Sequence, residues 1–128
     1  MKFNSLIPEL SVSNIENSIK FYTSIGFKIM YERKENKFCF LELEENQIMI
    51  EQINDNWNTG TLEYPFGRGI NISMSIKNIE QYYNDVIKNN IKVFQELSIN
   101  KYQVDDIIYE DKEFLIQDPD GYLLRFND

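Results

Sequence analysis

Hydrophobic and polar positions along the chain follow a helical period in two places. After Asn14, apolar residues recur at helical spacing until Gly26, a natural left-handed stop. The same stripe returns at Ile79–Ile87, after which Asn90 stands where a second glycine would be expected. Asn14 and Asn78 precede the two stripes and are good N-caps, because an asparagine oxygen accepts from unpaired amides of the first turn. The pattern predicts two capped helices.

Strand-like runs surround both helices. In the first half they cover Phe27–Tyr31, Lys37–Leu43 and Ile48–Ile53, and in the second half Ile91–Phe94, a segment near Ile107–Tyr109, Glu113–Gln117 and Leu123–Phe126. Asp118 to Gly121 has the composition of a tight turn, because proline presets one φ and glycine supplies a positive one.

The two halves repeat one another. Leu10 to Asn17 resembles Met74 to Gln81, which begins 64 residues later. Each half therefore reads β-α-β-β-β, and we expect one α+β domain in which two tandem βαβββ modules form a curved mixed sheet. We place the first module at residues 1–53, a linker at 54–69 and the second module at 70–128. The second half is longer by about ten residues within Gln95 to Lys112, for which a surface loop is favoured over a cleft wall or a dimer flap.

Composition narrows the chemistry. The 128 residues carry 13 Lys and Arg against 21 Asp and Glu, a net charge of −8, which argues against nucleic acid and anionic membranes as partners. Histidine is absent, which removes the commonest metal ligand and the usual acid–base group near neutral pH. The single cysteine, Cys39, allows no intrachain disulfide and is expected in the core. No signal peptide or membrane-spanning run is apparent, so we expect a cytoplasmic protein.

The order of these motifs resembles the vicinal oxygen chelate superfamily, which includes glyoxalase I, extradiol dioxygenases and bleomycin-resistance proteins. The resemblance covers nearly the whole chain. It is carried by Leu10 to Asn14, Phe21-Tyr22, Gly26-Phe27, Gly69 to Ile76 and Asp118 to Phe126. The last of these, together with Gln47 to Gln52, looks most like the bleomycin-resistance branch. The drug-binding relatives are homodimers with clefts between subunits, sometimes with an exchanged N-terminal strand, and the resemblance implies the same here.

Enzymes of the resembled superfamily hold a divalent metal with four His or Glu side chains. By motif, these positions fall here on Ile7, Glu51, Asn71 and Arg125. Only Glu51 is an ordinary ligand, and the fixed cation of Arg125 repels a metal ion. The resemblance thus implies the fold without the metal centre, and we expect neither a metal nor a cofactor.

Several residues are candidates for binding a ligand. Glu51 and Arg125 are either an ion pair that replaces the metal or separate solvated charges. Trp57 lies in the most polar stretch of the chain, where it either binds a ligand or folds back on the end of the sheet. In the resembled family this inter-module segment borders the ligand cleft.

Other candidates are left open by the sequence. Phe38 and Phe40 share one strand face, with Cys39 on the other, and either face can line the cleft. Phe66 is favoured as a core residue, whereas its neighbours Tyr64 and Arg68 are open. The predicted ligand-binding set is Phe38, Glu51, Trp57, Tyr64, Arg68, Asn71, Tyr102 and Arg125.

Motifs for catalysis are not found. There is no Gly-x-Ser-x-Gly elbow, P-loop or dinucleotide glycine fingerprint, and no catalytic carboxylate pair is identified by spacing. The resemblance to the bleomycin-resistance branch implies a metal-free protein that sequesters a cationic aromatic antibiotic of the bleomycin type and so confers resistance, and this is the function that we predict. An enzyme of the superfamily with an atypical site, and a binder of another metabolite, are the alternatives.

Overall fold

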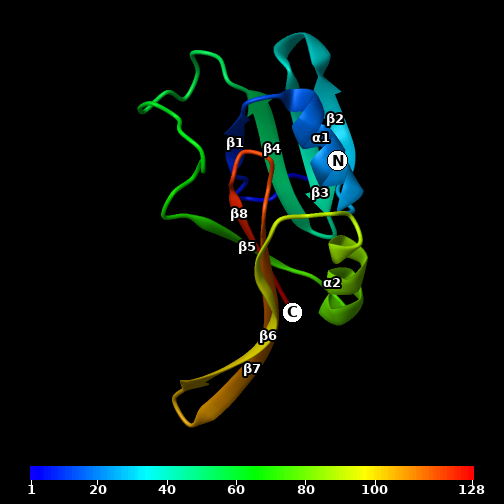
Figure 1. Cartoon of the computed structure of the whole chain (residues 1–128), viewed down its shortest axis with the longest axis vertical. Coiled ribbons are helices and arrows are strands. Elements are labelled where there is room, and N and C mark those ends of the chain that lie inside the picture. Colours follow the sequence, from blue (N-terminus) through cyan, green and yellow to red (C-terminus); the bar gives the residue numbers. More distant parts are fainter. The chain divides into compact units, whose positions relative to one another are not determined.

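One helix and one four-stranded sheet make up each half of the chain in the computed structural model, which describes residues 1–128 (Figure 1). The chain divides into two units, Met1–Phe66 and Gly67–Asp128. Neither helix has the length and apolar character needed to cross a membrane.

The first unit contains the strands and helix of one βαβββ module. Its elements are β1 (Glu9–Val12), α1 (Ile15–Ser24), β2 (Lys28–Arg33), a 3-10 turn at Lys34–Asn36, β3 (Phe38–Leu43) and β4 (Asn46–Gln52). The sheet order is β1-β4-β3-β2, with β1 parallel to β4 and the other pairs antiparallel.

The second unit repeats this arrangement. Its elements are β5 (Asn71–Ser75), α2 (Ile79–Ile87), β6 (Val93–Val104), β7 (Ile107–Gln117) and β8 (Leu123–Asn127). The sheet order is β5-β8-β7-β6, and only the pair β5 and β8 is parallel. The predicted α+β class and the two mixed βαβββ modules are therefore confirmed.

The boundaries of α1 follow from local chemistry. The Asn14 side-chain oxygen accepts from the Asn17 amide at 3.0 Å, as predicted for an N-cap. Gly26 has a φ of 106°, and the chain turns there into β2.

The start of α2 differs from the prediction. Asn78 has a φ of 55° and its side chain makes no capping hydrogen bond, so the predicted side-chain cap is wrong. An N-cap side chain reaches the first turn from an extended backbone, whereas Asn78 is left-handed. Its carbonyl oxygen accepts from the Tyr82 amide at 3.1 Å, as that of Asn14 does from the Ser18 amide, so only the side-chain cap is missing. Asn90, at the other end, has the left-handed φ of 53° that was expected.

Each helix covers one face of its own sheet. In the second unit, Tyr82 packs against Phe114 and Phe126 with ring centroids 5.9 and 5.1 Å apart, and Tyr83 against Phe114 at 4.9 Å. The corresponding face of the first sheet carries fully buried side chains, among them Val12, Cys39, Leu41 and Ile50. Cys39 is thus a core residue, as predicted. The opposite side of each sheet, away from its helix, is called the open face below.

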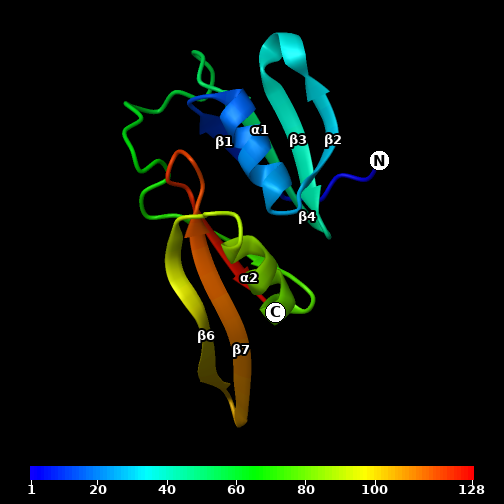
Figure 2. The same ribbon diagram turned by 45° about the vertical axis from the view of Figure 1, so that its right-hand side comes forward.

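The largest departure from the sequence analysis lies in the second unit. Gln95 to Lys112, where a surface loop was favoured, belongs almost entirely to the two paired strands β6 and β7, so that interpretation is wrong. The strands pair in register from Ile99 with Lys112 to Val104 with Ile107. Figures 1 and 2 show this hairpin running beyond the ends of β5 and β8. Alternation of β-branched and aromatic residues with polar ones favours strands here, even over a long insertion.

Candidate functional site

On the open face of the first sheet, one row of side chains crosses all four strands. Ser11 of β1 lies opposite Glu51 of β4, Glu51 opposite Phe38 of β3, and Phe38 opposite Arg33 of β2. Partners directly opposite one another in a sheet have Cβ atoms only about 5 Å apart on the same face. A carboxylate, an aromatic ring and a guanidinium group therefore stand side by side.

Aromatic rings gather around Phe38 on this face. We define the aromatic cluster as Phe3, Tyr31, Phe38 and Phe40. The Tyr31 ring lies 5.9 Å from Phe38 and 5.4 Å from Phe40, and Phe3 stacks on Phe40 at 5.2 Å. Phe38 and Phe40 are buried, whereas Phe3 is half exposed. Because these rings sit on the face that α1 does not cover, they are not part of the core between helix and sheet.

Arg33 caps the aromatic cluster. Its guanidinium carbon lies 4.4 Å from the centroid of the Phe38 ring and 5.6 Å from that of Tyr31. Both distances are within the range of a cation–π interaction. Neither Tyr31 nor Arg33 was singled out from the sequence. A register shift between Ile29 and Tyr31 brings both residues onto the face of Phe38, and no sequence pattern signals that bulge.

Two of the predicted ligand-binding residues lie exposed in the segment after β4. Trp57 is 71% exposed and has a φ of 60°, and Tyr64 is 53% exposed. Trp57 therefore does not fold into the core of its unit. Phe66, predicted as a core residue, is buried, as expected.

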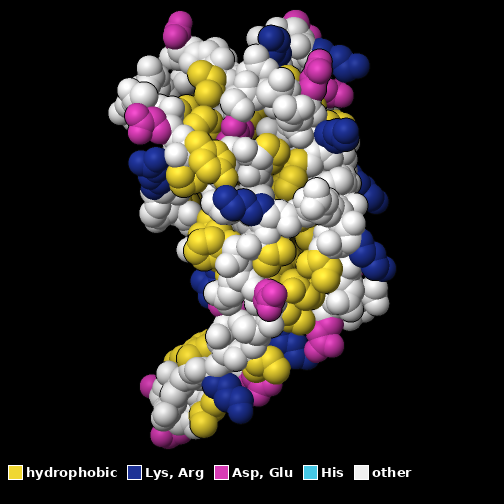
Figure 3. Space-filling view, viewed as in Figure 1, with side chains coloured by type: hydrophobic (Ala, Val, Ile, Leu, Met, Phe, Trp, Pro, Cys, Tyr) yellow, Lys and Arg dark blue, Asp and Glu magenta, His cyan; other side chains and the backbone are white.

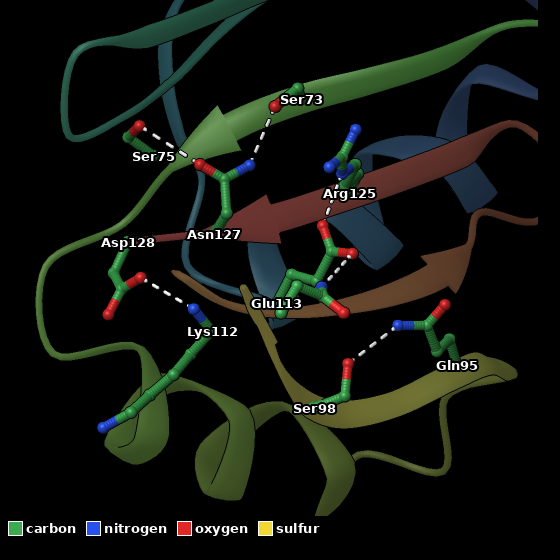
Figure 4. Close-up of polar contacts among 10 residues, drawn as sticks. Ser73, Ser75, Gln95, Ser98, Lys112, Glu113, Arg125, Asn127 and Asp128 are labelled. Atoms are coloured by element: carbon green, nitrogen blue, oxygen red, sulfur yellow. Dashed lines mark hydrogen bonds and ion pairs between the residues drawn. The ribbon is translucent and has the colours of Figure 1, made fainter. Parts of the chain in front are cut away.

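The open face of the second sheet is polar. Arg125 donates from Nε to Oε2 of Glu113 at 2.5 Å (Figure 4). Asn100 donates to the other oxygen of this carboxylate at 2.6 Å. Glu113 is only 8% exposed. Its carboxylate fixes the position of Arg125 and is neutralised by it. Glu113 was not recognised in the sequence, because it follows Lys112 in a segment rich in charge.

Hydrogen bonds also link β5 to β8. The Asn127 amide nitrogen donates to the Ser73 hydroxyl at 2.8 Å, and Ser75 donates to the Asn127 oxygen at 3.4 Å (Figure 4). Asn71, a predicted ligand-binding residue, is the exposed first residue of β5, two positions before Ser73. Asn71 and Arg125 therefore lie near one another on the same open face.

The strand register shows which residues of the two modules occupy equivalent positions. It differs from the match by motif, which placed Glu51 and Arg125 at equivalent positions. Leu10 pairs with Ile50, and Met74, 64 residues after Leu10, pairs with Phe126. The counterpart of Glu51 is therefore Asn127, and the counterpart of Arg125 is Met49. Glu51 and Arg125 both lie on the open faces of their sheets. They are not equivalent positions of the two modules, because Arg125 lies two residues before Asn127, the counterpart of Glu51.

Each member of the suggested Glu51–Arg125 pair has a polar partner within its own unit. Arg125 bonds to Glu113, and the Glu51 carboxylate accepts from Asn54 at 3.2 Å. No group of three or more Cys, Asp or Glu residues is arranged so as to hold a metal ion.

Tyr102 lies apart from Arg125. Its ring stacks on Tyr109, with centroids 5.6 Å apart, in the projecting part of the hairpin. Arg125 pairs with Leu115, six residues along β7 from Tyr109, which corresponds to about 20 Å along a strand. Arg68 precedes β5 in the exposed segment at the start of the second unit.

Several solved structures share this fold. TioX from Micromonospora sp. ML1 superposes with a TM-score of 0.76 at 10% identity, covering 98% of both chains. A glyoxalase/bleomycin resistance protein/dioxygenase from Alicyclobacillus acidocaldarius gives a TM-score of 0.69 at 20% identity, over 97% of this chain and 89% of that one.

No protein-family model and no curated protein matches the sequence. The structural comparisons define the class: the chain has the fold of the glyoxalase/bleomycin resistance protein/dioxygenase superfamily. This is the fold that the resemblance to the vicinal oxygen chelate superfamily implies.

Proposed function

We propose that this protein binds a small molecule without using a metal, and that its ligand is a cationic aromatic antibiotic of the bleomycin type. Sequestration of the antibiotic would confer resistance. The proposal includes a homodimer, as the resemblance to the bleomycin-resistance branch implies, and a location in the cytoplasm.

The exposure of Trp57 carries the proposal. A tryptophan that buries little of its ring within its own unit offers a large stacking surface to a ligand. The segment from Glu51 to Phe66 carries the carboxylates of Glu51, Asp55 and Glu63 and no basic residue. Acidic groups beside exposed rings favour a flat cation, and the net charge of −8 accelerates its approach.

Titration of the metal-analysed protein with metal-free bleomycin tests the proposal. We expect saturable quenching of Trp57, the only tryptophan, and heat of binding in a calorimeter without product formation. By calorimetry, Trp57→Ala should weaken binding about tenfold. Phe94→Ala is the matched control, because Phe94 is 60% exposed and lies outside the predicted ligand-binding set.

Absence of both heat and quenching would refute bleomycin as the ligand. Stoichiometric zinc or nickel in the purified protein, together with turnover of a small metabolite, would favour the enzymatic alternative. Saturable binding of a different metabolite would retain the binding role and change the ligand.

A further inference from the structure

We propose that Arg33 occupies, in the free protein, the place that the cationic group of the ligand takes over Phe38. Arg33 is thus a built-in competitor whose displacement opens the cation subsite. This inference deepens the proposed function, since it assigns the part of the protein that recognises positive charge.

The row across the first sheet supplies the geometry. Arg33, Phe38 and Glu51 stand at the same level on β2, β3 and β4. The ring of Phe38 lies between the guanidinium group and the carboxylate. Strands are spaced about 4.8 Å apart, so the backbones at Arg33 and Glu51 are separated by about 10 Å.

The aromatic cluster supplies the binding surface. Phe38 is 3% exposed and Phe40 is fully buried, so neither ring is available to a ligand while its covering groups stay in place. Arg33, at 4.4 Å from the Phe38 centroid, is the cationic part of that cover. The face of an aromatic ring carries partial negative charge, which attracts any organic cation that replaces Arg33.

Displacement of Arg33 is structurally simple. Arg33 is exposed and is the last residue of β2, which is an edge strand of its sheet. Rotation of its long side chain into water leaves the strand pairing unchanged. The residues opposite Phe38 on the two neighbouring strands are Arg33 and Glu51. Of these two, only the carboxylate of Glu51 attracts a cation that binds over the Phe38 ring.

The chemistry selects the ligand class. A guanidinium or ammonium group attached to a flat ring system would reproduce the contact of Arg33 with the Phe38 ring and, like Arg33, would be attracted by Glu51 on the next strand. A neutral aromatic molecule would lack both the cation–π contact with Phe38 and the attraction of Glu51. The site therefore favours cationic aromatic compounds over uncharged ones of similar size.

A side chain that occupies a site lowers the apparent affinity of every ligand that must displace it. Removal of the Arg33 guanidinium should therefore strengthen ligand binding, by about threefold for a cation–π contact at an exposed site. Most substitutions near a binding site weaken binding, so a gain in affinity is a specific signature.

The experiment compares Arg33→Met with Lys28→Met. Lys28 is also exposed and lies on β2, so both variants remove one positive charge from the same strand. Lys28 lies opposite Glu42, two pairs away from Phe40 towards the other end of β3. The probes are agmatine, which carries a guanidinium and an ammonium group, and metal-free bleomycin, with dissociation constants measured by calorimetry.

We expect Arg33→Met to bind both probes about threefold more tightly than the unaltered protein, and Lys28→Met to differ by less than twofold. Addition of Phe38→Leu to Arg33→Met should cancel the gain, provided that circular dichroism shows the double variant folded. Arg33→Lys should behave like the unaltered protein, because lysine also caps an aromatic ring.

Equal gains in the Arg33 and Lys28 variants would overturn the inference, because net charge alone would then explain them. Unchanged affinities in Arg33→Met, with bleomycin still bound by the unaltered protein, would overturn the inference and leave the proposed function intact. Tighter agmatine binding by Arg33→Met, with no bleomycin binding by any variant, would support the cation subsite and refute the proposed ligand.

Discussion

Arg125 and Glu113 form an ion pair between neighbouring strands, with Nε of the arginine 2.5 Å from Oε2 of the buried glutamate. Replacement of Arg125 with methionine should lower the free energy of unfolding by about 2 kcal/mol, because a buried carboxylate then loses its cation. Urea denaturation followed by circular dichroism measures the change.

Lys112→Met is the matched control, since it breaks the other well-defined ion pair of the unit. Lys112 and Glu80 are 2.6 Å apart, but their side chains are 34% and 60% exposed. Solvent screening should make its loss much less damaging than that of Arg125. Equal destabilisation by the two substitutions would contradict a special role for Glu113 burial.

The two asparagines at the helix starts should respond in opposite ways to removal of the side chain. At Asn14, glycine or alanine removes the bond to the Asn17 amide, and alanine should cost about 1 kcal/mol. At Asn78, glycine relieves a left-handed backbone without losing a side-chain cap, so stability should stay equal or rise by about 0.5 kcal/mol. Thermal unfolding of Asn14→Ala and Asn78→Gly measures both effects. A marked loss in Asn78→Gly would show that its side chain is needed.

Gly67 should tolerate alanine less well than Gly69. Both have a positive φ, 71° and 85°, so both substitutions strain the backbone by about 1 kcal/mol. Only at Gly67 would the new Cβ meet another side chain, the Tyr122 ring, at 2.6 and 2.9 Å. We expect Gly67→Ala to lose about 1–3 kcal/mol more than Gly69→Ala in urea denaturation. Equal losses would mean that the tyrosine ring moves aside freely.

The Cys39 thiol should be unreactive in the folded protein. Burial, with a contribution from the charge of Glu32, raises its pKa from an ordinary 9.0 to about 12. Modification by a disulfide reagent at pH 8 should therefore be slow in buffer and fast in urea. Because the unfolded thiol ionises first, stability due to this group is complete below pH 9 and declines as the pH rises towards 12. Rapid native-state modification would contradict its burial.

Local signals in the sequence were sufficient for much of the fold. The cap at Asn14 and the stop at Gly26 act within one turn of helix, so their effect can be inferred from neighbouring residues. The 64-residue repeat correctly indicated two similar modules, because both helices begin at the same point of the repeat. At Asn78 this reasoning failed, since the similarity in sequence conceals a different backbone conformation.

The register of the paired strands could not be predicted from the sequence. Glu51 and Arg125 were aligned from their motifs, whereas strand pairing makes Asn127 the counterpart of Glu51. The contact between Arg33 and Phe38 likewise depends on a bulge in β2 that shifts side chains by one position. A change of one residue moves a side chain to the other face of a sheet, and composition alone does not fix it.

The hairpin of β6 and β7 has a consequence for local unfolding. Figure 3 shows hydrophobic side chains on its surface, and Phe94, Ile99, Tyr102, Val104, Ile107, Ile108 and Tyr109 are all exposed. From Ile99 to Lys112 the two strands pair only with one another, because β8 pairs with β7 only from Glu113 onward. A two-stranded ribbon is only marginally stable in water. Its backbone amides should therefore exchange with deuterium through a local opening, long before those of Glu113 to Gln117 become accessible.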